Sequence, residues 1–250
     1  MSGQGICVCF ASGKGGAGKT SLAAGIGAAL AALGKRVLCM DCDPLRNLDL
    51  AMGMAEQAFM DFGDVAAGRA ALEEAAAEHP RRPGLFLLNA PAFGGETLSG
   101  GDMRALAAQI RARFDFCLLD APAGVGEAFR LALAASDRVL VVAGADALSR
   151  RAAQRVSMEL GAFPPGAARL IVNRVKPAPF RAPETTVDDI MDYAGLPLMG
   201  LVPEDAAFSR ALRRGLPVTV AEPKSAASRA CARIARRVAG ENAGLPPLYR

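Results

Sequence analysis

The 250-residue sequence predicts an α/β protein of three layers, in which helices cover both faces of a mostly parallel central sheet. Short apolar runs recur along the chain, and their near-continuous hydrophobicity is typical of strands that are buried on both faces. Segments long enough for one crossover helix lie between most of these runs, as parallel pairing requires. Seven runs are expected to be strands: 6–10, 37–40, 85–88, 116–119, 139–142, 170–172 and 198–201.

The segments between the runs account for the helical layers. Five of them are expected to be helices: 20–34, 101–113, 124–136, 147–161 and 184–195. We find no internal repeat and no linker rich in proline, glycine and serine, so residues 1–240 are expected to form one domain and 241–250 a short C-terminal tail. The stretch 90–101 is expected to be a loop that follows a strand, where ligands collect on α/β sheets.

The composition excludes several classes of protein. With 52% hydrophobic and 22% charged residues, it is that of a globular chain and not of a disordered, collagen-like or coiled-coil one. The longest uncharged stretch, 20–34, is shorter than the roughly 20 apolar residues that cross a bilayer. Residues 1–13 lack the features of a secretory signal, so a cytoplasmic location is expected. The formal net charge of +4 does not identify a partner.

The six cysteines and the single histidine offer little catalytic chemistry. The cysteines lie in or beside apolar runs and are expected to be buried packing residues. Cys39 and Cys42 form a CxxC pair, but no second pair completes a four-ligand metal set. His79 precedes Pro80 in an expected loop, where a solvated side chain is favoured over a catalytic one.

A phosphate-binding pattern, GxxxxGK[ST], joins the first expected strand to the first expected helix. Its residues are Gly13, Lys14, Gly15, Gly16, Ala17, Gly18, Lys19 and Thr20. The backbone N–H groups of such a loop surround a phosphate, and the helix N-terminus adds partial positive charge. Lys19 is expected to reach the β and γ phosphates, and the Thr20 hydroxyl a Mg²⁺ ion. A chance match in a flexible linker is disfavoured by the strand before and the helix after.

Lys14 distinguishes this loop from a generic one, because a second lysine is more charge than the phosphates of one nucleotide require. It is either a solvated loop lysine or a lysine presented to a nucleotide on a partner subunit. The stretch 12–20 resembles the deviant Walker A motif KGGxGK[ST] of the MinD/ParA family of dimerising ATPases, in which the early lysine crosses the dimer interface. The resemblance implies a P-loop NTPase fold, ATP and Mg²⁺ as ligands, and a homodimer in the ATP-bound state.

Carboxylates follow two further strands in the order that this family shows. Asp41 and Asp43 come at the end of the second strand, where the alternative is a capped turn. This stretch resembles switch I of the family, which implies that Asp43 positions the attacking water and lies near the metal. Asp120 ends the strand 116–119 and resembles the Walker B aspartate, which implies a role in the Mg²⁺ hydration shell.

A base-binding region is expected further along the chain. Asn173 and Arg174 end another strand and resemble the adenine-reading position of the family, although an ordinary Asn at a strand end is the alternative. Pro203 lies in a VPED stretch that matches the family close to adenine. Ser21, next to Thr20, is placed in the same nucleotide site.

Most of these motifs follow the MinD branch of the family, whereas the DxDPxxN spacing at 41–47 follows the ParA branch. The resemblance therefore implies an ATPase switch that dimerises on ATP and acts in septum placement in a bacterium. The alternative is a ParA-like ATPase that partitions chromosomes, plasmids or cargo by binding DNA. An ATP-dependent amidotransferase or ligase would need a second substrate pocket. A regulator without hydrolysis is disfavoured by the joint presence of Lys19, Thr20, Asp43 and Asp120.

Three features bear on partners. The tail 241–250 holds two adjacent prolines, so the amphipathic helix that ends many family members is not expected there. The stretch 210–237 carries eight basic residues against Glu222, which suits a solvated helix face, anionic lipid at the inner membrane surface, or DNA. The family implies a regulatory partner, a division inhibitor or an ATPase activator, but the helix 151–155 lacks two acids that family members carry.

Overall fold

A single eight-stranded sheet organises the chain in the computed structural model, which describes residues 4–57, 59–91, 98–176 and 186–245. The strand order is β3-β4-β2-β5-β1-β6-β7-β8, and every neighbouring pair is parallel except β3 with β4. The strands are β1 (Ile6–Ala11), β2 (Val37–Asp41), β3 (Ala77–Glu78), β4 (Leu85–Leu88), β5 (Phe116–Asp120), β6 (Arg138–Gly144), β7 (Ala168–Val175) and β8 (Leu198–Pro203).

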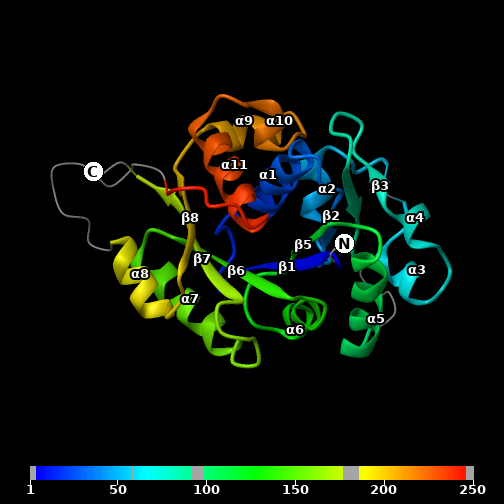
Figure 1. Ribbon diagram of the computed structural model, residues 1–250, viewed down its shortest axis with the longest axis horizontal. Helices are drawn as coiled ribbons and strands as arrows, with labels where there is room; N and C mark the ends of the chain where they lie inside the picture. Colours follow the sequence, from blue (N-terminus) through cyan, green and yellow to red (C-terminus); the bar gives the residue numbers. More distant parts are fainter. Residues whose placement is uncertain (1–3, 58, 92–97, 177–185, 246–250) are drawn as a thin grey trace.

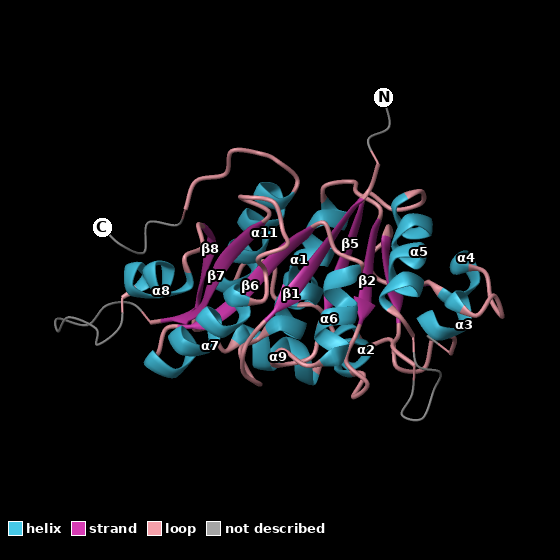
Figure 2. Cartoon of the chain, turned by 90° about the horizontal axis from the view of Figure 1, so that it is seen from below, coloured by secondary structure: helices cyan, strands magenta, loops and turns pink. Residues whose placement is uncertain are grey.

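Helices cover both faces of the sheet, as the sequence predicts (Figures 1 and 2). One apolar core lies under α3 (Phe62–Ala66), α4 (Leu72–Ala75), α5 (Gly100–Arg111), α6 (Glu127–Ala134), α7 (Ala147–Met158) and α8 (Val187–Ala194). A second core lies under α1 (Lys19–Ala32), α2 (Asn47–Met52), α9 (Ala207–Arg213), α10 (Val218–Ala221) and α11 (Ala226–Val238). The three-layer α/β/α architecture is therefore confirmed.

Local sequence explains where the outer helices begin. The side chains of Ser99, Asp146, Thr186 and Ser225 each accept a hydrogen bond from a backbone N–H in the first turn of α5, α7, α8 and α11. Helix α1 differs, since it is rich in alanine and glycine and most of its residues are buried. A Cβ at Gly27 would lie 2.6 Å from the Cys39 sulfur, so glycine lets α1 pack closely on β2.

The expected elements agree with the structure within a few residues at each end, and all seven expected strands are present. The short β3, α2, α3, α4, α9 and α10 were not expected. Residues 92–97 of the expected loop at 90–101, and residues 184–185 of the expected helix at 184–195, lie outside the described residues. The described helices include none that is both long and apolar enough to cross a membrane.

The cysteine prediction is confirmed, because all six are buried and free. The prediction of a solvated His79 is wrong, since this residue is only 2% exposed. Its backbone N–H donates to the Leu85 carbonyl, and its Nδ1 accepts from the Arg81 N–H at 3.1 Å. Burial lowers the pKa of His79. The loop that follows His79 brings the chain back to β4. The charged residues next to the histidine in the sequence do not predict this contact.

Candidate nucleotide site

The predicted phosphate loop connects β1 to α1 at the carboxyl edge of the sheet. Gly16 and Gly18 have φ values of 74° and 99°, which are left-handed conformations that favour glycine. Gly18 is the N-cap residue of α1 and makes no side-chain hydrogen bond to the helix. The first backbone N–H groups of α1 are therefore not used by a side-chain cap and remain as donors at the phosphate loop. A Cβ at Gly13 would lie 2.2 Å from the Ala152 carbonyl oxygen, because the loop packs directly against α7.

Lys19 is buried within this loop, at 8% exposure. Its ammonium donates to the Ser12 hydroxyl at 2.8 Å, and that hydroxyl donates to the Lys14 carbonyl oxygen at 2.8 Å. Burial lowers the pKa of Lys19, while the carboxylates of Asp120 and Asp43 act in the opposite direction. A cation held in a partly desolvated loop interacts strongly with an anion placed beside it.

Two buried carboxylates lie beside the loop at the ends of adjacent strands. Asp41 of β2 and Asp120 of β5 are partners in the sheet register. Burial raises the pKa of Asp120 to about 7, although a hydrogen bond from Thr20 and the charge of Lys19 oppose the rise. Burial also raises the pKa of Asp41 to about 6, against hydrogen bonds from two backbone N–H groups.

Asp41 shapes the segment that carries Asp43. The Asp41 carboxylate accepts the N–H of Asp43 and the N–H of Leu48, each at 2.9 Å. Asp43 in turn accepts the Leu45 N–H at 3.0 Å, which closes a tight turn before α2. The resemblance gave a role to Asp43 and none to Asp41. In the structure the Asp41 carboxylate accepts backbone N–H groups, and Asp43 lies half-buried at the rim of the site.

The oxygen ligands at the carboxyl edge of the sheet suit a Mg²⁺ ion that is bound together with phosphate. Oδ1 of Asp120 is buried and has no hydrogen-bond partner among the described residues, and Thr20 lies against the same carboxylate. Within those residues no group of three or more histidines, cysteines and acids could hold a metal by itself. Mg²⁺ typically takes one or two carboxylates and completes its shell with water and substrate phosphates, so this sparse set suits it.

A cavity of about 410 Å³ opens beside the loop, at the end of β7. Asn173 donates from Nδ2 to the Ala17 carbonyl oxygen at 2.8 Å, and a Cβ at Gly18 would lie 2.3 Å from that nitrogen. The cavity brings together the predicted Gly18, Ser21, Asn173, Arg174 and Pro203. Glu204 and Asp205, from the VPED stretch that was expected close to adenine, also line it. The remaining lining was not predicted and consists of Ala206, Phe208 and Ser209.

Lys14 lies apart from the buried half of the site. Its ammonium is 3.2 Å from both carboxylate oxygens of Asp146, the N-cap of α7. Partial burial acts against ionisation of Asp146, but hydrogen bonds from Ser149 and Lys14 lower its pKa. The two side chains are 39% and 50% exposed, so the pair contributes only about 0–1 kcal/mol. Asp146 was missed because its one sequence signal, the D-x-x-S cap pattern, reports a helix start and not a lysine partner.

Comparison with known proteins places this geometry in a family. The profile of the CobQ/CobB/MinD/ParA nucleotide binding domain matches residues 8–218. The chain belongs to this family. The septum site-determining protein MinD of Synechocystis sp. is 35% identical over 238 residues, which are 94% of this chain and 90% of that protein. MinD of Bacillus subtilis is 33% identical over 253 residues, covering 98% of this chain and 93% of its own length.

A solved structure agrees with these sequence relationships. The MinC:MinD cell division protein complex of Aquifex aeolicus contains a chain that is 34% identical, with a TM-score of 0.88 over 96% of this chain and 98% of that one. The resemblance to MinD/ParA proteins and the P-loop NTPase fold are therefore confirmed. The chain is a P-loop ATPase of the MinD type, and these MinD relatives support division-site placement over DNA partitioning.

Proposed function

We propose that this chain is a MinD-like switch that dimerises on ATP, hydrolyses it to ADP and phosphate, and thereby helps to place the division septum. The observation that carries the proposal is the different setting of the two loop lysines. Lys19 is buried among the strand-end acids, whereas Lys14 is partly exposed on the rim beside α7. The buried Lys19 suits the nucleotide of its own subunit, and the partly exposed Lys14 is within reach of a second molecule.

We propose which residues bind each part of the nucleotide. The backbone of residues 13–20 holds the phosphates, with Lys19 on the β and γ groups, and the cavity lined by Ser21, Asn173, Arg174 and Pro203 receives the base and sugar. Asn173 supports this assignment because its Oδ1 is buried and has no hydrogen-bond partner among the described residues. An amide oxygen without a partner is the kind of acceptor that a base amino group requires.

Hydrolysis needs a metal and an oriented water. Mg²⁺ would neutralise charge on the β and γ phosphates, with Thr20, Asp43 and Asp120 as its protein contacts or those of its water shell. Asp43 positions the attacking water, and Lys19 stabilises the transferring phosphoryl group. Because no strong general base lies in the loop, turnover is slow until a regulatory partner binds.

Dimerisation tests the role of Lys14. We expect sedimentation velocity to show a dimer for the wild type with ATP and a monomer with ADP, because only the triphosphate offers charged groups across the interface. Lys14→Ala should remain monomeric with both nucleotides. Lys224→Ala, which removes an exposed lysine from the loop before α11, is the matched control and should dimerise normally. Equal mass in all samples would reject the switch.

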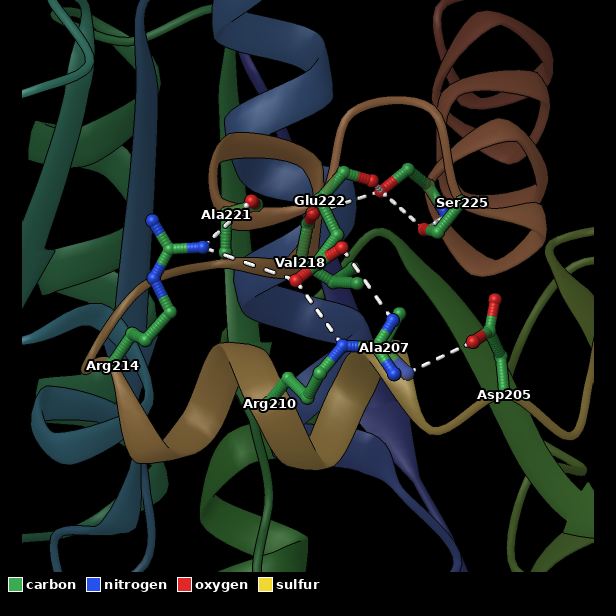
Figure 3. Close-up of polar contacts among 9 residues, drawn as sticks. Asp205, Ala207, Arg210, Arg214, Val218, Ala221, Glu222 and Ser225 are labelled. Carbon is green, nitrogen blue, oxygen red and sulfur yellow. Dashed lines mark hydrogen bonds and ion pairs between the residues drawn. The ribbon is translucent and has the colours of Figure 1, made fainter.

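Fewer basic side chains of the stretch 210–237 are available to a partner than its sequence indicates. Figure 3 shows Arg210 and Arg214 directed toward Glu222, and their shortest nitrogen–oxygen distances to its carboxylate are 3.2 Å and 3.9 Å. Arg214 also donates to the Ala221 carbonyl oxygen at 3.0 Å. These contacts join α9 to α10, so only part of the charge remains for a surface. The outward cations of this stretch include Arg213, Lys224, Arg229 and Arg236.

We propose that this remaining charge gives peripheral contact with the inner face of the cell membrane, with 1–240 as the ATPase domain and 241–250 as a tail. Residues 246–250 of that tail lie outside the described residues. Sedimentation of the ATP-bound protein with anionic vesicles and with duplex DNA separates the membrane from the nucleoid. Preference for DNA would favour the ParA-like alternative. A regulatory protein partner is consistent with the Aquifex structure, in which MinD is in complex with MinC.

A further inference from the structure

A second cavity of about 410 Å³ lies at the amino edge of the sheet, opposite the nucleotide site. Three arginines line it: Arg138 at the start of β6, Arg169 near the start of β7 and Arg237 in the last turn of α11. We call it the arginine cavity. The rest of its lining is Val8, Leu140, Met199 and Val238, with Gly166, Ala167, Gly240, Glu241, Asn242 and Ala243 around them.

Two of the arginines occupy a sheet face that is otherwise apolar. The register pairs Val8 with Arg138 and Leu140 with Arg169, so both arginines lie on the face that carries Val8 and Leu140. That face belongs to the core under α1 and α11. Like charges on neighbouring strands of one face repel each other, and an anion between them relieves the repulsion. Because Arg138 is exposed and Arg169 is half-buried, water already screens part of it.

The donors of the three guanidinium groups are mostly unused. Each guanidinium has five N–H donors. Arg138 donates to the Val238 carbonyl oxygen at 3.3 Å, and Arg237 donates to the carbonyl oxygens of Ala243 and Leu198, each at 3.2 Å. The Arg169 side chain has neither a hydrogen bond nor an ion pair with any described residue. At least this one half-buried cation therefore faces the arginine cavity without a protein partner.

No acid in the described lining compensates this charge from within the arginine cavity. Glu241 is the one acid among those lining residues, and its carboxylate lies 3.9 Å from the Arg236 side chain while 55% exposed. The C-terminal end of α11 explains Arg138 and Arg237 in part, because cations stabilise the carbonyl groups of a last helical turn. It does not explain Arg169, which contacts no such carbonyl.

We propose that the arginine cavity binds a phosphate group carried on a larger molecule. The guanidinium groups come from two strands and one helix, and a tetrahedral phosphate can present oxygens to all three, whereas a carboxylate offers two oxygens in one plane. The volume of about 410 Å³ exceeds that of a single small ion, and Val8, Leu140 and Met199 offer apolar contact to the remainder of the ligand. A soluble phosphomonoester and a phospholipid headgroup share this chemistry.

This site is separate from the phosphate loop and does not depend on the proposed ATPase cycle. Strand β6 separates the two, because Arg138 is its first residue while Asp146, the partner of Lys14, follows its last. The binding assay therefore uses protein saturated with Mg²⁺ and a non-hydrolysable ATP analogue, which fills the loop. A Lys19→Ala protein, assayed in parallel, should bind the phosphate probes as the wild type does, whatever its hydrolysis rate.

Isothermal titration with glycerol 3-phosphate and with inorganic phosphate tests the proposal. We expect Arg169→Ala to raise the dissociation constant about ten-fold or more, because a charge-assisted contact is lost. Arg169→Lys keeps the positive charge but loses the planar guanidinium group with its several donors. Its dissociation constant should therefore lie between those of Arg169→Ala and the wild type. Arg104→Ala removes an exposed arginine from α5 and should have no effect. Circular dichroism confirms that each variant is folded.

Vesicles of phosphatidylcholine with and without phosphatidic acid identify the source of the phosphate. Co-sedimentation that needs phosphatidic acid and is lost in Arg169→Ala assigns a lipid headgroup. Soluble probes that bind the wild type more tightly than Arg169→Ala, with vesicle binding that is absent or unchanged in the variant, assign a soluble phosphomonoester. Vesicle binding that Arg169→Ala keeps belongs to the outward cations of 210–237. The proposal is overturned if neither probe nor vesicle binds, or if Arg169→Ala lowers neither the binding of the soluble probes nor the binding of the vesicles.

Discussion

The two edges of the central sheet differ in the charged side chains that they carry. At the carboxyl edge the signs alternate, with Lys19 beside Asp43 and Asp120 and with Lys14 on Asp146. At the amino edge Arg138, Arg169 and Arg237 face one cavity with carbonyl oxygens as their main described partners. Acids beside a phosphate site repel the ligand unless a cation joins them, so the first edge needs a metal, whereas the second binds anions with guanidinium groups alone.

The largest difference between the edges is expected in ATP hydrolysis. Lys19→Ala should lower the rate by about 10²–10³-fold, because it removes a preorganised cation from the transferring phosphoryl group. Arg169→Ala should leave the rate unchanged, since the arginine cavity lies at the far end of the strands. Steady-state phosphate release measures both. A comparable loss in the two variants would show that the edges act as one site.

Within the carboxyl edge, Asp43→Asn separates binding from chemistry. We expect hydrolysis to fall by about 10²-fold because the amide orients water poorly. The variant should still form the ATP-dependent dimer, since Lys14, Lys19 and the loop backbone are unchanged. Sedimentation with ATP and a single-turnover assay provide the two readouts. Loss of the dimer together with hydrolysis would mean that Asp43 builds the site and does not serve catalysis.

The buried Asp120 makes the carboxyl edge sensitive to pH in the absence of nucleotide and Mg²⁺. Burial raises its pKa from 3.8 to about 7, so between these values the folded chain holds a proton that the unfolded chain has lost. The contribution of this group to folding stability therefore falls as the pH rises through that range, by about 1.4 kcal/mol for each pH unit, and stays low at higher pH.

Asp120→Asn removes that dependence and provides the measurement. In urea denaturation the advantage of the variant over the wild type should grow between pH 4 and 7 and then level off. Gln109→Ala, at an exposed position of α5 that carries no titratable group, is the control and should show no such growth. A constant difference across the range would contradict the raised pKa.

The smallest effect is expected at the amino edge. Arg169→Gln should raise the free energy of unfolding by about 0.5 kcal/mol at low salt, because it relieves repulsion among the three arginines. The gain should vanish near 1 M salt, where charges are screened beyond about 3 Å. Arg104→Gln should change stability equally at both salt concentrations. Denaturant titration at two ionic strengths distinguishes these results.

The strands and the phosphate loop were predictable because their signals are local. A strand buried on both faces must be apolar along its length, and a loop that surrounds phosphate needs glycine and lysine at fixed spacing. Contacts between distant segments were not predictable in this way. Lys14 and Asp146 are 132 positions apart, and Asn173 and Ala17 are 156 apart. His79 was misjudged for the same reason, because its burial depends on how the chain returns to β4.

The amino-acid sequence by itself determined the layered fold, the family and the identity of the phosphate loop, since each rests on residues that are neighbours along the chain. Tertiary structure alone decided that Asp41 serves the backbone, that Glu222 neutralises two arginines, and that three further arginines meet at the amino edge. The physical reason is that charge and burial depend on distance in space, and parallel strands bring together side chains that lie far apart in sequence.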